Sequence, residues 1–543
     1  MMWSATAKKE QVIVFVLAIL ATFIPVAVIE LKVLHYTSGF FIYPLDDTFI
    51  HMQLARNLAI HHTWGININQ FGSASSSLFY TTLLAVCFSL FNVHTIIPFI
   101  INCIAGILLL IVIQKWLVRQ AINLKGQLII IGLIIFLTPL PTLIMSGMEH
   151  TLQCLFSLLF IISFSDWLNE YGEQTKQLKI NARVIIYGFL TVAIRYEGMF
   201  IIAIAILILL WRRNIRQAVL LGFISFLPVI VFGIYSISKG GFFLPNSVLV
   251  KSETIQLSIH GLIKFISGIL IEKLTFSRAG IAPLAIQRLL ILLPLIYLIF
   301  RNKLRVNGKY FIILVIVFGC TVLHMALAAT GWFYRYEAYL VLLGTLIISF
   351  LIIKFFDRVY LGEIKATQIV TLILFFFLSF PLLLRSLTAF SKAPRSCINI
   401  YEQQLQMSRF SKRYYNTDVI AANDIGAVSF YTDARILDLW GLANNEVAKS
   451  RKLNYWTPDF LDSLSKAKNA SIAIVYDKWF SDSLLKRWSK VATWQIQNNV
   501  VCGDSIVSFY SIDSSKKSSL KANLLNYQSH LPSDVKVTYT EHK

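Results

Sequence analysis

The stretch QVIVFVLAILATFIPVAVI, at positions 11–29, is an unbroken apolar run as long as a transmembrane helix. About 20 apolar residues in a helix cross the roughly 30 Å hydrocarbon core of a bilayer. The run ATQIVTLILFFFLSFPLLL, at positions 366–384, has the same character. Hydrophobic residues make up 56% of the chain and charged residues only 14%, whereas a soluble chain carries about 25% charged residues. The sequence therefore predicts an α-helical polytopic membrane protein.

Apolar runs of this kind recur along the chain, and we expect about eleven transmembrane helices. The first run is too long, and too poor in a small-residue cleavage site, to be a removable signal peptide. One further apolar run, at 77–93, is expected to lie beside the membrane or to re-enter it without crossing. The expected spans are 11–33, 95–115, 126–146, 150–168, 184–195, 197–211, 216–238, 280–300, 309–329, 337–355 and 367–389.

Basic residues decide the predicted topology, because loops on the cytoplasmic side of a membrane carry an excess of Lys and Arg. With these spans, every basic cluster falls on the side of the N-terminus, which is therefore predicted to be cytoplasmic. The net charge of +21 is then explained by topology, and no nucleic-acid partner is expected. The clusters contain Lys8, Lys9, Lys115, Arg119, Lys125, Lys176, Lys179, Arg183, Arg212, Arg213, Arg216, Arg301, Lys303, Arg305, Lys309, Lys354, Arg358 and Lys365.

The chain is expected to form two domains. Residues 1–389 would form the membrane domain, with an outer loop at 34–94. After 389 the apolar runs stop, and short strand-like stretches follow, with helical patterns such as SLLKRWSK between them. Residues 390–543 are therefore predicted to form a small α/β domain on the outer face. Its expected strands are TDVIAAN, ARILDLW, SIAIVYD, ATWQIQ and VSFYSI.

Cysteines give no metal pattern. Four of the six lie in apolar runs, where they are expected to pack as small hydrophobic side chains. Cys397 and Cys502 lie in the polar C-terminal part. They either form a long-range disulfide in an oxidising compartment or remain two free thiols.

Two adjacent carboxylates, Asp46 and Asp47, open the segment DDTFIHMQLARNLA just beyond the first span. The segment has the pattern of an amphipathic helix in the membrane interface. One interpretation is structural, because either aspartate could cap this helix. The other is catalytic, because neighbouring carboxylates push their pKa values apart, which suits a general base and its partner. No cofactor is certain, and a divalent cation (Mg²⁺ or Mn²⁺) held by the two aspartates is one alternative.

Two further motifs place charge at the ends of predicted spans. In SGMEH, Glu149 and His150 either mark the turn of a helical hairpin or bring a second acidic group, Glu149, to the site of Asp46. In RYEG, Arg195 and Glu197 interrupt an apolar stretch, where charged residues usually pair or line a cavity. Arg195 is therefore either half of a structural ion pair or a ligand for phosphate.

Two outer segments offer polar side chains for a ligand. Asn246 and Lys251 follow the turn GGFFLP, whose glycines and proline are ordinary turn residues. In WFYRY, Arg335 lies among aromatic residues of the kind found at membrane interfaces, and it is a candidate for binding an anionic headgroup. Acidic turns also follow the first two predicted strands, at 423–427 and 437–442. They can be ligand crevices of an α/β fold, but we interpret them as ordinary turns.

The ordered motifs DDTFIHMQLARNLA, SGMEH, IRYEG, FFLPNSVLVKS, FYRYEAYL and NDIGAVSFYTDARILDLWGL resemble a known family. They are similar to motifs of the GT-C superfamily of polytopic glycosyltransferases, particularly the bacterial branch of mycobacterial-type arabinofuranosyltransferases. Each motif is short, and the resemblance, which covers about 43–445, depends on their order.

The resemblance implies transfer of a sugar from a polyprenyl-phosphate donor to a glycan or lipid acceptor outside the cytoplasm, at the inner membrane of a bacterium. It implies that Asp46 is the base for the acceptor hydroxyl, with Asp47 beside it and Glu149 as a supporting acid. Arg195, Arg335 and Lys251 would bind the donor phosphate. Glu197, Asn246 and His150 would contact substrate, and the lipid bilayer would present the donor.

Two other functions compete with glycosyl transfer. A transporter or flippase for a lipid-linked glycan would use membrane acids for coupling ions, but the sequence has no detectable inverted repeat and has an outer domain. A non-catalytic subunit of envelope assembly would keep the fold without the chemistry. Replacing Asp46 or Asp47 by Asn distinguishes these from an enzyme.

Overall fold

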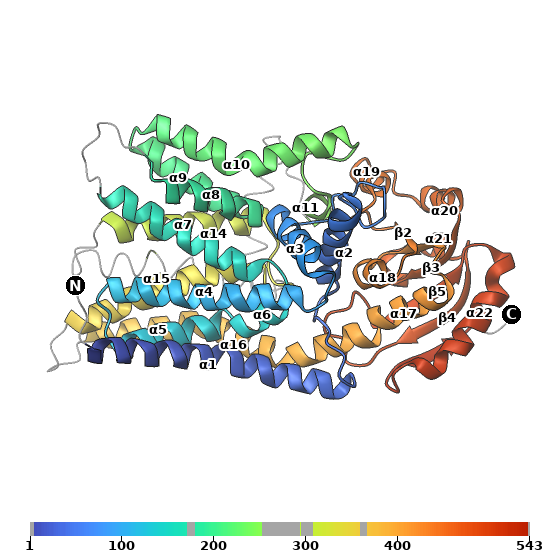
Figure 1. Ribbon diagram of the computed structural model, residues 1–543, viewed down its shortest axis with the longest axis horizontal. Coiled ribbons are helices and arrows are strands. Elements are labelled where there is room, and N and C mark those ends of the chain that lie inside the picture. The colour runs from blue at the N-terminus through green and yellow to red at the C-terminus, as the bar shows by residue number, and fades with distance from the viewer. Residues whose placement is uncertain (1–4, 171–179, 252–293, 295–307, 359–365, 541–543) are drawn as a thin grey trace. The chain divides into compact units, whose positions relative to one another are not determined.

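The computed structural model describes residues 5–170, 180–251, 294, 308–358 and 366–540 (Figure 1). The chain divides into two compact units. We call them the helical unit (Met1–Val28, Phe99–Ile230 and Ser252–Ser391) and the sheet unit (Ile29–Pro98, Val231–Lys251 and Lys392–Lys543). The predicted outer loop at 34–94 thus belongs to the same unit as the C-terminal sheet.

Predicted spans coincide with helices wherever the structure describes them, and the predicted span 280–300 lies outside the described residues. Within the described ranges, five helices are long and apolar enough to cross a membrane: Lys9–Tyr36, Ile97–Arg119, His150–Glu170, Ile215–Ser238 and Gly308–Leu327. The helices that match the spans are α1 (Ala5–Tyr36), α4 (Ile97–Arg119), α5 (Leu124–Leu137), α6 (Leu140–Met145), α7 (His150–Glu170), α8 (Ala182–Ile194), α9 (Gly198–Trp211), α10 (Ile215–Ser238), α14 (Gly308–Leu327), α15 (Ala338–Arg358) and α16 (Ala366–Glu402).

One span was predicted wrongly as continuous. The expected helix at 126–146 is broken into α5 and α6, and the break falls at Pro139. Proline lacks a backbone N–H and its ring clashes with the preceding turn, so it ends a helix at or before its neighbour. The last span also continues further than expected, because α16 runs past 389 to Glu402.

Burial follows the apolar pattern within the helical unit. All residues of α15 from Ala338 to Leu343 are buried. A helix that is apolar around its whole circumference is expected to be enclosed by others. The N-terminal part of α1, in contrast, exposes large apolar side chains such as Val12 and Leu17, as expected of a helix that faces lipid.

Two helices of the sheet unit pack on each other, α2 (Asp46–His61) and α3 (Leu78–Phe91). Helix α3 contains the apolar run that was expected not to cross the membrane. Its 14 residues would extend about 21 Å, which is shorter than the roughly 30 Å hydrocarbon core. It buries Tyr80, Thr81 and Leu84, and the short helix α11 (Asn246–Lys251) follows later in the chain.

A six-stranded sheet has the order β2-β1-β3-β5-β4-β6. β1 is parallel to β2 and β3, while β5 is antiparallel to β3, and β4 is antiparallel to β5 and β6. All five predicted strands are confirmed, and β6 was missed. The strands are β1 (Val419–Ala422), β2 (Arg435–Asp438), β3 (Ala470–Val475), β4 (Ser489–Gln495), β5 (Ile506–Ser511) and β6 (Lys536–Tyr539).

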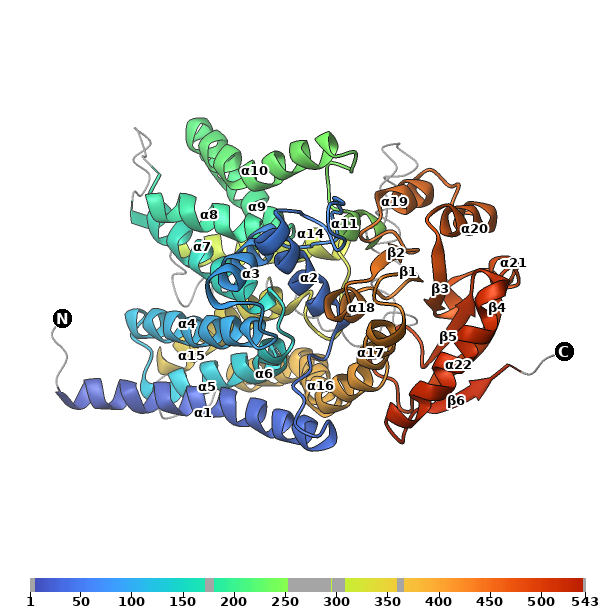
Figure 2. The ribbon, with the colours of Figure 1, turned by 45° about the vertical axis from the view of Figure 1, so that its right-hand side comes forward.

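Helices cover both faces of the sheet (Figure 2). On one face, Val447 of α19 (Asn445–Lys452) and Leu461 of α20 (Pro458–Ala467) join an apolar core with β1 and β3. On the other, Phe410 of α17 (Gln404–Tyr414) contacts the rings of Trp494 and Phe509, and Tyr527 of α22 (Lys517–Tyr527) stacks on Trp494. The predicted helical pattern at 483–490 forms only one turn, α21 (Asp482–Leu485), before β4 begins.

Cys397 and Cys502 are both buried and free. The free-thiol alternative is therefore the one that the structure shows. The Cys502 thiol donates a hydrogen bond to Gln404 Oε1 over 3.3 Å.

Candidate active site

Asp46 occupies the first position of α2, but it does not cap that helix. The N-cap residue is Leu45, and no side chain caps the helix there. Instead Asp46 reaches a helix that lies 380 residues further along the chain, α18 (Gly426–Tyr431). Its Oδ2 accepts the Gly426 N–H at 2.6 Å and its Oδ1 accepts the Ala427 N–H at 2.7 Å. The capping interpretation for α2 is thus wrong, and Asp46 instead satisfies the unpaired N–H groups that begin α18.

Gly426 is required by the closeness of this contact. A Cβ added at this position would lie 2.1 Å from the Asp46 carbonyl oxygen and 2.6 Å from Oδ2. No side chain can occupy that space without moving the backbone of α2. The glycine of the NDIGA motif therefore allows the Asp46 carboxylate to approach the start of α18. Our interpretation of 423–427 as an ordinary turn was wrong.

Asp424 is the second carboxyl of this site, and its side chain is half-buried. Its Oδ2 accepts a hydrogen bond from Gln404 Nε2 at 2.7 Å and lies 3.0 Å from the Tyr476 hydroxyl. The Tyr476 hydroxyl is also 2.7 Å from Gln403 Oε1. These polar residues come from α17 and from the end of β3, so the sheet and its covering helix fix the position of Asp424.

Burial raises the pKa of Asp46 well above the ordinary aspartate range, and the negative charge of Asp424 adds to the rise. The N–H groups of Ala427 and Gly426 oppose it. Burial also raises the pKa of Asp424, against its hydrogen bonds to Asp46 and other partners. Two carboxyls so close, one of them buried and the other half-buried, cannot both ionise at low cost. We infer that Asp46 and Asp424 share one proton.

The shared proton predicts a pH dependence of stability. The folded pair holds its proton at pH values where the unfolded chain has lost it, so the free energy of unfolding falls as pH rises from about 4 towards the raised pKa. The slope is at most about 1.4 kcal/mol per pH unit for one proton. Asp424→Asn should reduce this slope, because it removes the negative charge that adds to the rise of the Asp46 pKa and leaves the effect of burial. The measurement is chemical unfolding of the sheet unit within the full chain, followed by Trp fluorescence between pH 4 and 9.

Asp482→Asn is the matched control, since Asp482 is exposed and lies on a different helix from the pair. It should keep the slope of the unmodified protein. A slope in Asp424→Asn as steep as in the unmodified protein would contradict the shared proton.

Asp47 differs from Asp46 in exposure. Asp46 is only 8% exposed, whereas Asp47 is half-buried. The charge of Asp47 raises the pKa of Asp424, which places it within electrostatic range of the pair. Three carboxyls therefore gather where α2 and α18 begin, and the more accessible of the two predicted aspartates is Asp47.

The side chains around Asp46 and Asp47 are not arranged to bind a divalent cation. Both oxygens of Asp46 accept backbone N–H groups, which are donors and compete with a metal. In the part of the chain that the structure describes, no group of three or more His, Cys, Asp or Glu could hold a metal ion. The cation that the sequence analysis considered at Asp46 and Asp47 does not fit this arrangement.

Helix α2 is enclosed on its polar side as well. Gln53 Nε2 donates to the Ile66 carbonyl at 2.7 Å, Asn57 Nδ2 donates to the Gly65 carbonyl at 2.8 Å, and Arg56 Nη1 donates to the Phe430 carbonyl at 2.8 Å. Gln53 and Asn57 are buried. The expected amphipathic interface helix was therefore wrong, because these polar residues bond backbone within the sheet unit.

Within the helical unit, Arg195 joins two acids. Its Nη1 lies 2.5 Å from Glu149 Oε1, and its Nη2 and Nε lie 2.6 and 2.9 Å from the two oxygens of Glu197. The side chains of Arg195 and Glu149 are 6% and 0% exposed. The ion-pair interpretation of Arg195 is the one that the structure shows. At the same turn, Gly198 is required because a Cβ would lie 2.1 Å from the Thr191 carbonyl oxygen.

The Tyr336 ring lies close to the predicted residues Arg335, Arg195 and His150. The guanidinium carbons of Arg335 and Arg195 lie 5.1 and 5.6 Å from the centre of the Tyr336 ring, and the His150 ring lies 6.0 Å from it. Arg335 is 1% exposed. The structure therefore brings Glu149, His150, Arg195, Glu197 and Arg335 into one buried cluster, which we call the arginine cluster.

A second ion pair, which the sequence analysis missed, orders the segment that carries Arg335. Arg385 Nε lies 2.8 Å from Glu337 Oε1, and both side chains are fully buried. Glu337 Oε2 accepts the Gly331 N–H at 2.8 Å, and Arg385 Nη2 donates to the Tyr334 carbonyl. The backbone of residues 332–334 is strained, since Trp332, Phe333 and Tyr334 have φ values of 37°, 59° and 61°. An arginine in the predicted span 367–389 was the available signal.

Asn246 lies in the sheet unit and is buried. Its N–H donates to the Ser73 carbonyl at 3.1 Å, and its Nδ2 donates to Asn445 Oδ1 at 2.9 Å. The side chain of Lys251 falls outside what the structure describes. Asp438 confirms the ordinary-turn interpretation of 437–442, because its carboxylate accepts the N–H groups of Trp440, Gly441 and Ala443. Substrate contacts of Asn246 and Lys251 stay predictions, as does a common site for Asp46 and Glu149.

The apolar helices and the small C-terminal sheet give the chain the fold of GT-C-type membrane glycosyltransferases. It is similar to the crystal structure of ArnT from Cupriavidus metallidurans bound to undecaprenyl phosphate, with a TM-score of 0.51, 11% identity, and 94% of this chain and 99% of that chain covered.

It is also similar to the oligosaccharyltransferase of Archaeoglobus fulgidus in the apo form, with a TM-score of 0.52, 13% identity, and 94% of this chain and 75% of that chain covered. A third similar structure is the archaeal oligosaccharyltransferase AglB from Archaeoglobus fulgidus in complex with an inhibitory peptide and a dolichol-phosphate. The TM-score is 0.52 and the identity 11%, and the match covers 99% of this chain and 77% of that chain.

Residues 398–510 match a family model described as a domain of unknown function, DUF8728. No curated protein matches the chain. The expected GT-C architecture is confirmed as a fold, and the arabinofuranosyltransferase branch stays a prediction.

Proposed function

We propose that the protein is a membrane glycosyltransferase that moves a sugar from a polyprenyl-phosphate donor to a hydroxyl of a glycan or lipid acceptor. The observation that carries this proposal is the pair at the start of α2, where Asp46 is locked against α18 and Asp47 is half-buried. One carboxylate is held by the scaffold, and its neighbour is accessible. The named ligands of two structural relatives, undecaprenyl phosphate and dolichol-phosphate, support a lipid-phosphate donor.

The exposure of the two aspartates favours Asp47 as the catalytic base and Asp46 as a positioning residue. In the proposed step the Asp47 carboxylate takes the proton of the acceptor hydroxyl. The acceptor oxygen attacks the anomeric carbon of the donor, and the bond from that carbon to the phosphate oxygen breaks. The polyprenyl phosphate leaves with the bonding electrons, and a single displacement inverts the anomeric centre.

Guanidinium groups of the arginine cluster suit the leaving phosphate. Arg335 is proposed to bind it, because arginine offers a planar fork of donors to phosphate oxygens. Arg195 contributes positive charge and is oriented by Glu149 and Glu197. His150, Asn246 and Lys251 are proposed to contact substrate.

The proposed topology follows the positive-inside distribution. Residues 1–389 form a multi-pass domain of a bacterial inner membrane with a cytoplasmic N-terminus, and 390–543 lie outside the cytoplasm. Within the GT-C superfamily, the motif order favours the branch of mycobacterial-type arabinofuranosyltransferases, and the transferred sugar is either a hexose or a pentose.

The function is tested with full-length protein in liposomes that contain lipid-linked sugars extracted from a strain lacking the protein. We expect labelled sugar to pass from the lipid fraction to an acceptor glycan, with release of polyprenyl phosphate. Labelled lipid that crosses the bilayer without any acceptor-bound sugar would instead identify a flippase. Absence of both products, with acceptor glycans from the same strain present, would contradict an enzymatic function.

A further inference from the structure

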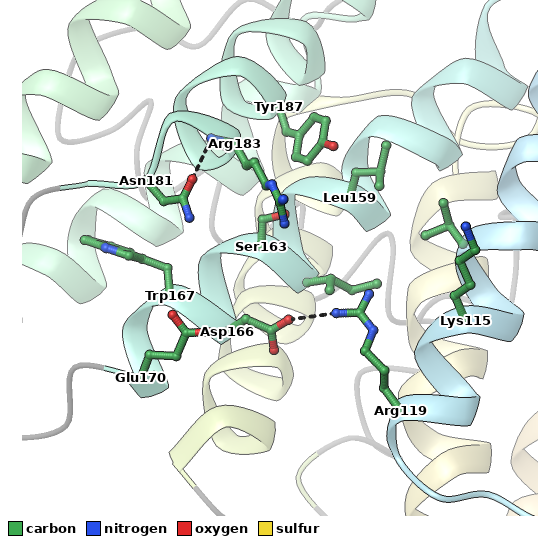
Figure 3. A pocket seen from close by; sticks show the side chains of 12 residues that line it. Lys115, Arg119, Leu159, Ser163, Asp166, Trp167, Glu170, Asn181, Arg183 and Tyr187 are labelled. Carbon is green, nitrogen blue, oxygen red and sulfur yellow. Dashed lines mark hydrogen bonds and ion pairs between the residues drawn. The ribbon is translucent and has the colours of Figure 1, made fainter. Parts of the chain in front are cut away.

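The helical unit contains a cavity of about 320 Å³ that the proposed reaction does not use (Figure 3). Three helices line it. Lys115 and Arg119 come from the last two turns of α4, Asp166 and Glu170 from the end of α7, and Arg183 from the first turn of α8.

Positive charge exceeds negative charge around the cavity. Asp166 is already engaged, because Lys309 forms an ion pair with its Oδ1 and Arg119 Nη1 lies 3.6 Å from its Oδ2. With Lys309 included, four basic side chains face two acidic ones, which leaves an excess of two positive charges. The cavity is therefore suited to an anion.

The guanidinium groups are arranged to approach one ligand from two sides. In Figure 3, Arg183 extends from α8 towards Ser163, and Arg119 extends from α4 towards Asp166. Each guanidinium presents a planar set of donors that matches phosphate oxygens, and an exposed lysine adds a third charge. The side chains of Lys115, Arg119 and Arg183 are exposed, so a ligand can reach them.

The rest of the lining is apolar and aromatic. Leu159 and Ile162 present aliphatic surface, and Trp167 and Tyr187 add rings. Aromatic side chains of this kind are enriched where lipid headgroups meet the hydrocarbon core. Since the same cavity offers cations and apolar walls, its ligand should have an anionic head and an aliphatic part.

The predicted topology places this end of the helices at the cytoplasmic leaflet, which carries anionic lipids. Basic pockets between transmembrane helices on that side bind lipid headgroups. Two hydrogen bonds also join helices at this end: the Tyr310 hydroxyl of α14 donates to Gln120 Oε1 at 2.6 Å, and Arg212 Nη1 donates to the Leu168 carbonyl at 3.5 Å.

We propose that this cavity binds the phosphate group of an anionic lipid in the cytoplasmic leaflet, with Arg119, Arg183 and Lys115 around the phosphate. The site goes beyond the proposed transfer reaction and rests on the predicted topology, not on the chemistry at Asp47. The lipid is either an anionic phospholipid or a polyprenyl phosphate, which share a phosphate attached to an aliphatic chain.

The test measures binding of a fluorescent phosphatidylglycerol to the full-length protein in nonionic detergent. The double variant Arg119→Gln/Arg183→Gln should weaken binding about thirtyfold, as expected from two basic contacts at a membrane surface. The matched control is Lys125→Gln/Arg216→Gln, which removes the same charge from exposed positions outside the cavity. It should bind as the unmodified protein does, and binding should fall as salt rises.

Competition distinguishes the sources of the phosphate. Displacement of the probe by undecaprenyl phosphate at lower concentration than by phosphatidylglycerol would assign the site to a polyprenyl phosphate, and the reverse order would assign it to a phospholipid. Equal displacement by phosphatidylcholine or by inorganic phosphate would overturn the proposal of an anionic lipid. Equal weakening in the cavity variant and the control would overturn the cavity as the site. Because the measured quantity is lipid binding, failure of sugar transfer does not affect the result.

Discussion

Asp47→Asn is expected to lower the rate of sugar transfer by about 10²–10⁴-fold, the contribution typical of a positioned general base. The Asn side chain keeps the shape of Asp but cannot accept the proton of the acceptor hydroxyl. Because Asp47 is half-buried and Asn has the same shape, the free energy of unfolding should fall less than in Asp46→Asn. The measurement is the initial rate of transfer in liposomes, together with the unfolding midpoint of the same preparation.

Asp46→Asn, in contrast, should lower the stability of the fold, so the two variants distinguish the roles of Asp46 and Asp47. Its amide group can accept only one of the two N–H groups of α18, so either Gly426 or Ala427 loses its acceptor. An unsatisfied buried donor costs about 1–3 kcal/mol, and the unfolding midpoint should fall. Asp482→Asn is the control for both, because Asp482 is exposed and outside the site.

Two outcomes would contradict this assignment. If Asp47→Asn retained more than about a tenth of the transfer rate, which is far above the loss expected of a general base, Asp47 would not be the base. If Asp46→Asn lost transfer without any fall in the unfolding midpoint, the roles of the two aspartates would be exchanged.

Arg385→Met is expected to destabilise the protein by about 3–5 kcal/mol, the cost of leaving one partner of a buried ion pair uncompensated. Met keeps an unbranched apolar stem but cannot neutralise Glu337, whose side chain is fully buried. The variant also removes the donor to the Tyr334 carbonyl, so the strained segment 332–334 should lose order and misplace Arg335. We expect a lower unfolding midpoint in detergent and a lower affinity for the lipid-linked donor.

The double variant Glu337→Gln/Arg385→Met provides the decisive comparison. It removes both charges, so it should regain much of the stability that Arg385→Met loses. Arg487→Met serves as the control for an exposed pair: Arg487 Nη2 lies 2.6 Å from Asp459, whose side chain is 81% exposed, and its loss should cost about 0–1 kcal/mol. A double variant no more stable than Arg385→Met would show that the charge pair is not the source of the effect.

Much of the fold could be predicted from the sequence, because the features that decide it are local. A run such as 11–29 fixes a helix by composition alone, and strands such as 471–477 are apolar stretches between polar turns. The strand β6 was missed because KVTY is a short stretch with two exposed and two half-buried residues, without a buried apolar face. The break at Pro139 was an avoidable error, since a proline in a predicted span is a local signal.

The candidate site was only half predictable. Asp46, Asp47 and Arg195 were identified because a charge beside an apolar run is conspicuous in the sequence. The partner Asp424 lies in the NDIGA motif, which we interpreted as a turn, because nothing local indicates that this strand end meets the start of α2. Tyr476 and Gln404 carry no signal of their own. Their importance follows from hydrogen bonds to Asp424 that only the assembled sheet creates.

The contact between Asp46 and Gly426 also constrains when the protein can become active during its synthesis. The aspartate pair leaves the ribosome more than 300 residues before the glycine, as the two positions show. At about 5–20 residues per second, the first outer segment waits on the order of tens of seconds for its partner. Throughout that interval α2 lacks the N–H groups that hold Asp46 in place. A chain truncated before 426 would therefore be inserted without an ordered carboxylate pair, so incomplete products would not transfer sugar at the membrane.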